Sequence, residues 1–323
     1  MNLIVTSSPH IRGKETTARI MADVLLALMP ALVVGICVQG LRALAVTLVT
    51  MAACLAGEAL MQCSLKRSFT LFDGSAAVTG LLLAMTLPAS VPYWVAAVGG
   101  LFAVAVAKAL CGGLGQNVFN PALAARALLM LVFPVYLIRF PAVGQPAPLL
   151  GAADVVTAAT PLHAMQMPAL PQTTLVDLLI GRSGGTIGEV SALALMLGGV
   201  YLLARKVISL RIPAAYLGTV ALLTLVFHKT DTPLLWMLYS LVSGGLLLGA
   251  IFMATDYATS PVTPWGQILY GVGCGILTVV FRYTGLFPEG VTYAILLMNA
   301  AVWMLDRYTA PRRFGSVKGG VGT

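Results

Sequence analysis

The sequence predicts an all-α polytopic membrane protein with about ten transmembrane helices, arranged as two inverted five-helix repeats that contain broken or reentrant helices. Three observations support this fold class. Hydrophobic residues make up 59% of the chain and charged residues only 9%, whereas a soluble domain carries about 25% charged residues. Apolar runs of membrane-spanning length recur in two groups of five. Glycines and prolines recur at one constant spacing between the two groups.

Apolar runs that can cross a hydrocarbon core ~30 Å thick as helices define the organisation of the chain. Those of the first half cover residues 20–38, 44–61, 75–87, 94–110 and 121–138. Those of the second half cover residues 189–204, 212–227, 233–251, 267–283 and 291–305. We therefore expect a first membrane repeat over 1–138, a polar loop over 139–188, a second membrane repeat over 189–306 and a tail over 307–323.

Positive charge sets the expected orientation, because Lys and Arg collect on cytoplasmic loops. With the N-terminus inside, the cytoplasmic segments hold Arg12, Lys14, Arg19, Lys66, Arg67, Arg205, Lys206, Arg211, Arg307, Arg312, Arg313 and Lys318. The opposite side holds Arg42, Arg139, Arg182, Lys229 and Arg282. Both termini are therefore expected in the cytoplasm and the 139–188 loop on the outer side. The net charge of +8 follows from this topology and does not indicate a nucleic-acid partner.

The two halves share a pattern of helix-breaking residues. Three pairs stand 172 residues apart: Pro92 and Pro264, Gly99 and Gly271, and Gly113 and Gly285. An odd number of helices per half turns the second copy upside down, and inverted repeats of this kind build sites at the midplane from broken helices. Interrupted segments lie at 79–92 and 254–264, and 112–121 is matched by 285–290.

Charged side chains inside the apolar runs are candidate functional residues, because charge within a span is costly. Asp23 and Lys108 stand near the ends of their runs, so we expect them to extend toward the membrane surface. Glu58 lies deeper in its run. Arg126 lies one turn into its helix and needs a carboxylate or an electron-rich ring as a partner. A structural pairing and a role at a cofactor or on an ion path are equally open for it.

Asn120 directly before Pro121 is typical of a helix N-cap with proline at the first helical position. Such a helix start offers free N–H groups to an anion or to an electron-rich ring. A tight reentrant turn that serves packing alone explains the same residues equally well.

The polar loop contains the stretch Asp154–Pro161, which ends in a threonine hydroxyl followed by proline. Pro161 disfavours a helical conformation of Thr160, so its hydroxyl is expected on an extended segment. A threonine oxygen is a poor nucleophile without an activating base, and His163 is the nearest candidate base. The stretch therefore favours a site that another enzyme modifies, against the simpler alternative of a solvated loop rich in small residues.

This stretch resembles the flavinylation motif Asp-x-x-Ser/Thr-Gly-Ala-Ser/Thr, whose last hydroxyl carries FMN through a phosphodiester made by a separate flavin transferase. The matching residues are Asp154, Thr157, Ala159 and Thr160, while Ala158 replaces the usual glycine. A second stretch, 183–186, departs further, because Ile180 stands where the motif has Asp and Gly185 replaces Ala. We interpret it as the glycine-rich approach to the sixth helix, with Glu189 in the first helical turn.

Three segments, 73–88, 112–122 and 188–194, resemble RnfD, the D-type membrane component of the Rnf electron-transport complex, and the similarity extends over essentially the whole chain. A related family member is NqrB, a membrane component of the sodium-pumping NADH:quinone reductase. NqrB usually has a longer N-terminal extension, so the Rnf resemblance is preferred and NqrB is the alternative.

The resemblance implies a membrane component of an ion-translocating ferredoxin:NAD oxidoreductase in the bacterial cytoplasmic membrane. It implies electron transfer through FMN on Thr160, coupled to transport of Na⁺ or H⁺. It further implies a second flavin, riboflavin or FMN, among the broken helices near Asn120 and Arg126. The implied partners are the Rnf proteins of types A, B, C, E and G, the flavin transferase and the lipid bilayer.

Other cofactor classes lack support in the sequence. The five cysteines include no C-x-x-C pair, and most lie in or beside apolar runs. We therefore expect no metal or iron–sulfur site built from this chain alone. A cofactor-free channel or carrier for a small solute remains the alternative from another class, because inverted repeats with broken helices also serve transport. A third interpretation is a purely structural scaffold.

Overall fold

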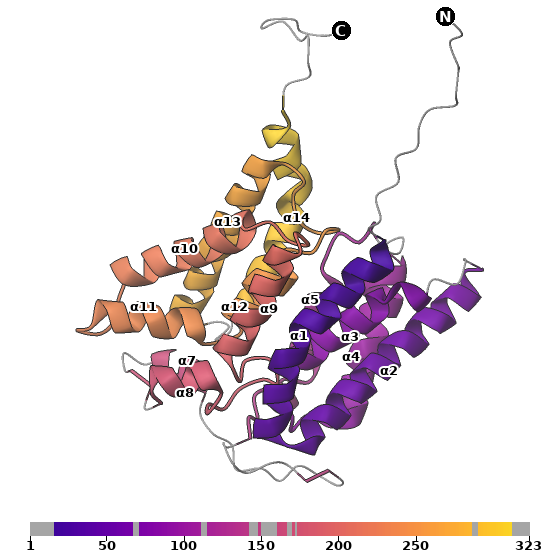
Figure 1. Ribbon diagram of the computed structural model, residues 1–323, viewed down its shortest axis with the longest axis horizontal. Helices are drawn as coiled ribbons and strands as arrows, with labels where there is room; N and C mark the ends of the chain where they lie inside the picture. Colours follow the sequence, from indigo (N-terminus) through magenta and orange to yellow (C-terminus); the bar gives the residue numbers. More distant parts are fainter. Residues whose placement is uncertain are drawn as a thin grey trace, which may run out of the picture.

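The computed structural model describes residues 16–66, 71–110, 115–141, 148–149, 160–166, 170–171, 173–285 and 290–311. Within these ranges the chain consists of helices and turns, with no strand. The helices form two groups that lie side by side, with α1–α5 in one group and α9–α14 in the other (Figure 1). The all-α class predicted from the composition is therefore confirmed.

The first group comprises α1 (Thr17–Gln39), α2 (Leu41–Ser64), η1 (Leu71–Asp73), α3 (Ser75–Thr86), α4 (Tyr93–Phe102), η2 (Ala103–Leu110), α5 (Pro121–Val132) and α6 (Pro134–Leu137). Gly40 between α1 and α2 has a φ of 83°, which a glycine adopts without a steric penalty. α2 then packs against both α3 and α4, and α5 lies against α3 and η2.

The second group comprises α9 (Ala192–Ala204), α10 (Arg211–Val226), α11 (Pro233–Val242), α12 (Leu246–Leu248), η3 (Gly249–Met253), α13 (Pro264–Thr284) and α14 (Val291–Thr309). α10 packs against α11 and α13, and α13 packs against α14. The short helices α7 (Pro161–Gln166) and α8 (Leu175–Ile180) lie between the two groups in sequence. They sit beneath α11, at the opposite end of the bundle from the end of α14 (Figure 1).

Helices occupy all ten apolar ranges expected from the sequence, but they differ in length. By length and composition, α1, α2 and α13 can each cross a membrane. A fourth span results if α11 is joined to Leu246–Met253 across a 61° bend. Gly244 and Gly245 make that bend with φ values of 73° and 64°. The run 121–138 is interrupted too, because Pro134 starts the separate helix α6.

The two groups meet along an antiparallel contact between α1 and α9. At one end, Asp23 near the start of α1 accepts hydrogen bonds from Tyr201 (2.8 Å) and Arg205 (3.1 Å) at the end of α9. At the other end, a Cβ added to Gly35 would stand 2.6 Å from the carbonyl oxygen of Ile187. A Cβ added to Gly198 would overlap with the backbone of Ala27. The absence of side chains at the two glycines therefore sets the close approach of the helices.

α5 and α14 also cross the boundary between the groups in opposite directions. The side-chain amide of Asn299 is oriented so that both its oxygen and its nitrogen are hydrogen-bonded. In this orientation its oxygen accepts a hydrogen bond from the backbone N–H of Asn120 at 3.1 Å. Further along α5, Arg126 lines the same cavity as Val291 and Thr292 at the start of α14. The start of α5 therefore lies beside the middle of α14, and its second turn lies near the first turn of α14.

The expected positions of three charged residues were wrong. Lys108 does not extend to a membrane surface, because its ammonium is buried and lies 2.6 Å from Glu58 Oε1. Asp23 is also buried, against α9. Glu189 is not in the first turn of a helix, since α9 begins at Ala192 with Ser191 as its N-cap.

Tertiary backbone hydrogen bonds explain the later start of α9. Ile187 N–H donates to Leu87 O at 3.0 Å, and Gly188 N–H donates to Met85 O at 2.7 Å. These bonds hold the segment before α9 against the end of α3 and keep it out of the helix.

Candidate functional site

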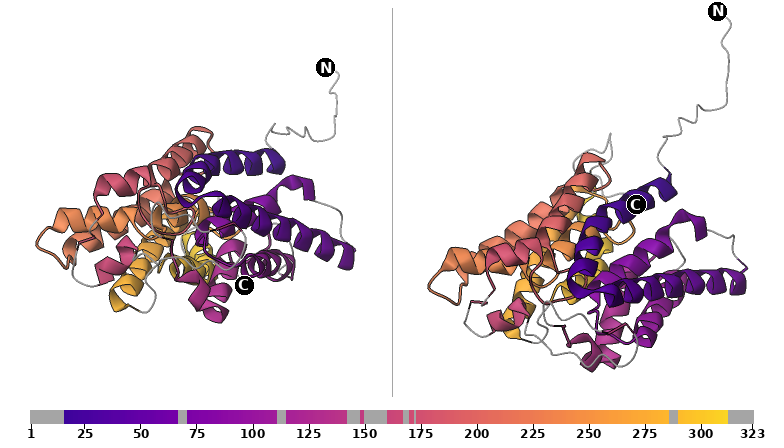
Figure 2. Two further views of the ribbon diagram at one scale, coloured as in Figure 1. Left: turned by 90° about the horizontal axis from the view of Figure 1, so that it is seen from below. Right: turned by 60° about the horizontal axis from the view of Figure 1, so that its bottom comes forward.

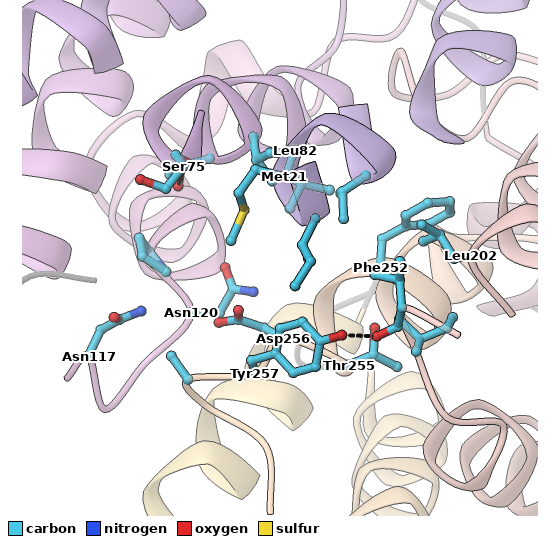
Figure 3. A pocket seen from close by; sticks show the side chains of 18 of the residues that line it. Met21, Ser75, Leu82, Asn117, Asn120, Leu202, Phe252, Thr255, Asp256 and Tyr257 are labelled. Carbon is cyan, nitrogen blue, oxygen red and sulfur yellow. Dashed lines mark hydrogen bonds between the residues drawn. The ribbon is translucent and has the colours of Figure 1, made fainter. Parts of the chain in front are cut away.

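A large cavity lies on the boundary between the two groups of helices (Figure 3). The empty space in and around it is about 780 Å³, a value that counts open solvent as well as the interior. One wall comes from α1, α3, η2 and the start of α5, and the other from the end of α9, η3 and the segment after it. Both η2 and η3 are π-helical, and such turns often occur at functional sites.

Asn120 fixes one edge of the large cavity. Its Oδ1 accepts hydrogen bonds from the N–H groups of Ala122 (3.1 Å) and Leu123 (3.4 Å), which confirms the predicted N-cap. Its Nδ2 donates to Met253 O at 3.2 Å. One side chain therefore caps α5 and joins it to the end of η3 in the other half.

A chain of polar contacts borders the same cavity on the side of α3. Lys108 Nζ donates to Glu58 Oε1 and to Ser75 Oγ, both at 2.6 Å. Ser75 Oγ in turn donates to Asp73 Oδ1 at 2.6 Å. The ammonium thus reaches the cavity with two oxygen partners already in place.

The lining of the large cavity combines apolar and polar side chains. Met21, Val24, Leu82 and Phe252 supply apolar contact, while Asn117, Asn120 and Asp256 supply polar groups (Figure 3). Asn117 is buried, and its Oδ1 has no hydrogen-bond partner within the described ranges. An unpartnered buried acceptor of this kind fits an N–H group of a bound ring, since leaving it unpaired is costly.

Arg126 does not line the large cavity. It faces a smaller one of about 280 Å³ together with Glu189, Thr186, Gly244 and Thr292. Glu189, which sequence reasoning did not select as a site residue, attracts Arg126 electrostatically. The structure therefore places the two candidates of α5, Asn120 and Arg126, in separate cavities.

The Glu189 carboxylate is enclosed by backbone. A Cβ on Gly185 or on Gly245 would stand 3.0 or 2.7 Å from its oxygens, and Thr186 N–H donates to Oε2 at 3.4 Å. The two glycines belong to segments 60 residues apart, so sequence spacing alone could not show that they enclose a single glutamate.

Thr160 lies at the start of α7 and is partly buried. Its carbonyl accepts from His163 N–H at 2.9 Å, and its Oγ1 lies 3.3 Å from the same N–H. The His163 ring pairs with Gln166 instead, with Nδ1 3.1 Å from Oε1. Asp154, Thr157 and Ala159 fall outside the described ranges, so their arrangement around Thr160 stays a prediction.

Comparisons with known proteins agree on one family. The family model described as "NQR2, RnfD, RnfE family" matches residues 4–315. The chain is 47% identical to the D-type component of the Na(+)-translocating ferredoxin:NAD(+) oxidoreductase complex of Acetobacterium woodii, over 98% of this chain and 97% of that protein. It is 39% identical to the D-type component of the proton-translocating ferredoxin:NAD(+) oxidoreductase complex of Clostridium ljungdahlii, over 97% and 96%.

A third relative is the D-type component of the ion-translocating oxidoreductase complex of Stutzerimonas stutzeri, which is 39% identical over 94% of this chain and 93% of its own length. These matches cover both groups of helices, the boundary between them and the loop with Thr160. The chain therefore belongs to the NQR2, RnfD, RnfE family.

Proposed function

We propose that this chain is the D-type component of an ion-translocating ferredoxin:NAD oxidoreductase complex, in which it passes electrons through bound flavin. The observation that carries this proposal is 47% identity over 98% of the chain to a relative of that name. Relatives at 47% and 39% identity are named for Na⁺ and for H⁺ respectively, so the coupled ion of this chain is one of these two.

Thr160 is the proposed attachment site for FMN, with Asp154, Thr157 and Ala159 as the residues that a flavin transferase recognises. The motif supports this assignment, and so does the partial exposure of Thr160 at the start of a short helix. The flavin supplies the redox chemistry, and the protein supplies its position and electrostatic surroundings. A covalent link holds the cofactor on the outer side, where a dissociable one would be lost.

A second flavin, riboflavin or FMN, is proposed for the large cavity. Asn120 at the cap of α5 and Asn117 with its unpartnered Oδ1 are the polar groups that would orient the ring. Arg126 lies six residues beyond Asn120, or ~9 Å along the helix. It would act on the ring through its positive charge, and its nearer electrostatic partner is Glu189.

The proposed arrangement in the bacterial cytoplasmic membrane has both termini in the cytoplasm and Thr160 in the periplasm. α7 lies at the opposite end of the bundle from the end of α14, which supports opposite sides for Thr160 and the tail (Figures 1 and 2). The antiparallel pairs α1/α9 and α5/α14 support two inverted repeats over 1–138 and 189–306, since an inversion turns equivalent helices antiparallel. The Rnf proteins of types A, B, C, E and G are the proposed partners.

Thr160→Ala tests the function directly when the full chain is produced with its flavin transferase. We expect the wild-type polypeptide to show flavin fluorescence in a denaturing gel and the Thr160→Ala chain to show none. Thr174→Ala is the matched control, because Thr174 also caps a short outer helix. Mass spectrometry of the 139–188 peptide locates the adduct. A fluorescent Thr160→Ala band would move the site, with Thr157 next, and a colourless wild-type chain would favour a solute carrier.

A further inference from the structure

Asn299 is a buried amide in the middle of α14. The residue is 2% exposed, and every other residue of 294–304 is apolar. A polar group inside an apolar helix is costly to bury unless it is hydrogen-bonded. Asn299 does not line the large cavity, so the role of its amide depends on the residues that it contacts.

The Asn299 amide joins three other parts of the chain. Its Nδ2 donates to Thr259 O at 3.1 Å, in the segment after η3, and to Tyr270 Oη at 2.6 Å, in α13. Its Oδ1 accepts from the backbone N–H of Asn120 at 3.1 Å, at the start of α5. One side chain therefore holds elements of both groups of helices together.

Two of these contacts lead to the large cavity. Asn120 lines the cavity from α5, and Asp256 lines it from the segment after η3 (Figure 3). Thr259 supports Asp256 twice, because its Oγ1 donates to Asp256 Oδ2 at 3.1 Å and its N–H donates to Asp256 O at 3.3 Å. Asn299 thus contacts Asn120 directly and Asp256 through Thr259.

These contacts require an amide at position 299. Thr259 O only accepts hydrogen bonds, and the backbone N–H of Asn120 only donates one. An asparagine side chain serves both partners at once, since its nitrogen donates and its oxygen accepts. A carboxylate would place a second acceptor against Thr259 O, and an apolar side chain would leave both groups unpaired.

Helix packing alone explains part of this arrangement. Polar side chains often join helices within membranes, and the bond to Tyr270 links α14 to α13 in this way. The bonds to Asn120 and Thr259 have a further effect, because these partners carry or support polar groups of the large cavity. They fix the cavity wall of the first group of helices relative to the wall of the second group.

We propose that Asn299 is a positioning residue for the second flavin: it sets the distance between Asn120 and Asp256 across the large cavity, and so determines how tightly the ring binds. This inference rests on the proposed second flavin and is independent of the covalent one. Groups that contact a ligand bind it well only when the residues behind them hold their positions. Loss of the amide should therefore weaken binding without removing any side chain from the cavity lining.

Asn299→Asp tests this assignment in the full chain, produced without the flavin transferase so that no covalent flavin contributes. The change keeps the size of the side chain and an oxygen for the Asn120 N–H, but it removes the donor to Thr259 O. Riboflavin and FMN are titrated separately into the purified chain, and binding is followed by fluorescence anisotropy. We expect a dissociation constant roughly 10-fold above the wild-type value, the order that one lost hydrogen bond to a ligand gives.

Tyr216→Phe is the matched control. It removes a buried hydrogen bond of 2.6 Å to Thr278 in the same group of helices, and neither residue lines the large cavity. The flavin affinity of this variant should equal that of wild type. Circular dichroism checks that every variant compared keeps the helix content of wild type.

Thr259 offers a second pair of variants, which does not depend on the folding of Asn299→Asp. Thr259→Val keeps the shape of the side chain and the carbonyl that Asn299 contacts, but it removes the hydroxyl beside Asp256. Flavin binding should therefore weaken. Thr259→Ser retains that hydroxyl and should bind flavin as wild type does.

Wild-type affinity in both Asn299→Asp and Thr259→Val would overturn the assignment. An equal loss of affinity in Tyr216→Phe would also overturn it, because any buried hydrogen bond would then have the same effect. A wild-type chain that binds neither riboflavin nor FMN would exclude the second flavin and this inference with it. That outcome would leave the covalent flavin on Thr160 untouched, so the two flavin proposals fail separately.

Discussion

The ammonium of Lys108 lies 2.6 Å from Glu58 Oε1, and the two side chains are 5% and 7% exposed. Lys108 belongs to η2 and Glu58 to α2, so the ion pair joins two neighbouring elements inside the first group of helices. Glu58 Oε2 has no hydrogen-bond partner among the residues described. The pair is therefore buried and only partly satisfied, which makes its response to substitution informative.

Removing one partner of this pair should destabilise the protein strongly. Glu58→Gln leaves the Lys108 charge buried without its counter-ion, a change that typically costs ~3–5 kcal/mol. The double variant Glu58→Gln/Lys108→Met removes both charges and should recover most of that loss. Thermal unfolding in detergent, followed by circular dichroism, measures both effects. A single variant as stable as wild type would show that the pair contributes nothing to the fold.

Gly198→Ala should weaken the contact between α1 and α9. A Cβ at Gly198 overlaps with the backbone of Ala27, and overpacking of this kind costs ~1–3 kcal/mol or more. Gly218→Ala is the control, because a Cβ there meets nothing within 4 Å. That variant should gain ~0.5–1 kcal/mol, since alanine is favoured over glycine in a helix interior. The two midpoints of thermal unfolding should therefore move in opposite directions.

Asn120 caps α5 and also joins it to the end of η3, and substitutions can remove one or both of these contacts. Asn120→Ala removes both the cap of α5 and the bond to Met253 O, and loss of a cap alone costs ~1 kcal/mol. Asn120→Ser keeps a capping oxygen but removes the donor to Met253. If the second flavin occupies the large cavity, both variants should lose non-covalent flavin on purification. Equal flavin content in wild type and both variants would exclude Asn120 from that site.

Asp23→Asn should have a smaller effect than Glu58→Gln. The Arg205 side chain that pairs with Asp23 is 37% exposed, and exposed ion pairs contribute about 0–1 kcal/mol. The hydrogen bond from Tyr201 is also accepted by an asparagine oxygen. Comparing the unfolding midpoints of Asp23→Asn and Glu58→Gln checks this order.

Local signals in the sequence predicted several helix boundaries correctly. Asn120 before Pro121 marks the start of α5 because the capping side chain and the missing proline N–H act within a few residues. Pro92 and Pro264, which share the repeat spacing, stand at the starts of α4 and α13. The expected end near Leu87 and Pro88 is also found, with α3 ending at Thr86.

Features that depend on distant contacts could not be predicted in the same way. Lys108 is buried because Glu58, 50 residues away, supplies a carboxylate, and no local pattern contains that pairing. Glu189 stays outside α9 because Ile187 and Gly188 bond to the end of α3. Asn120 and Arg126, two candidate cofactor-binding residues six positions apart, line separate cavities, and the bend at Gly244 and Gly245 contributes to the one that holds Arg126.

The close approach of α1 and α9 at Gly35 and Gly198 limits how the two halves can move. Sliding one helix along the other would drive ordinary side chains into carbonyl groups that now face glycine. The contact between α1 and α9 is therefore rigid, and movement of the first group of helices as a body against the second group is disfavoured.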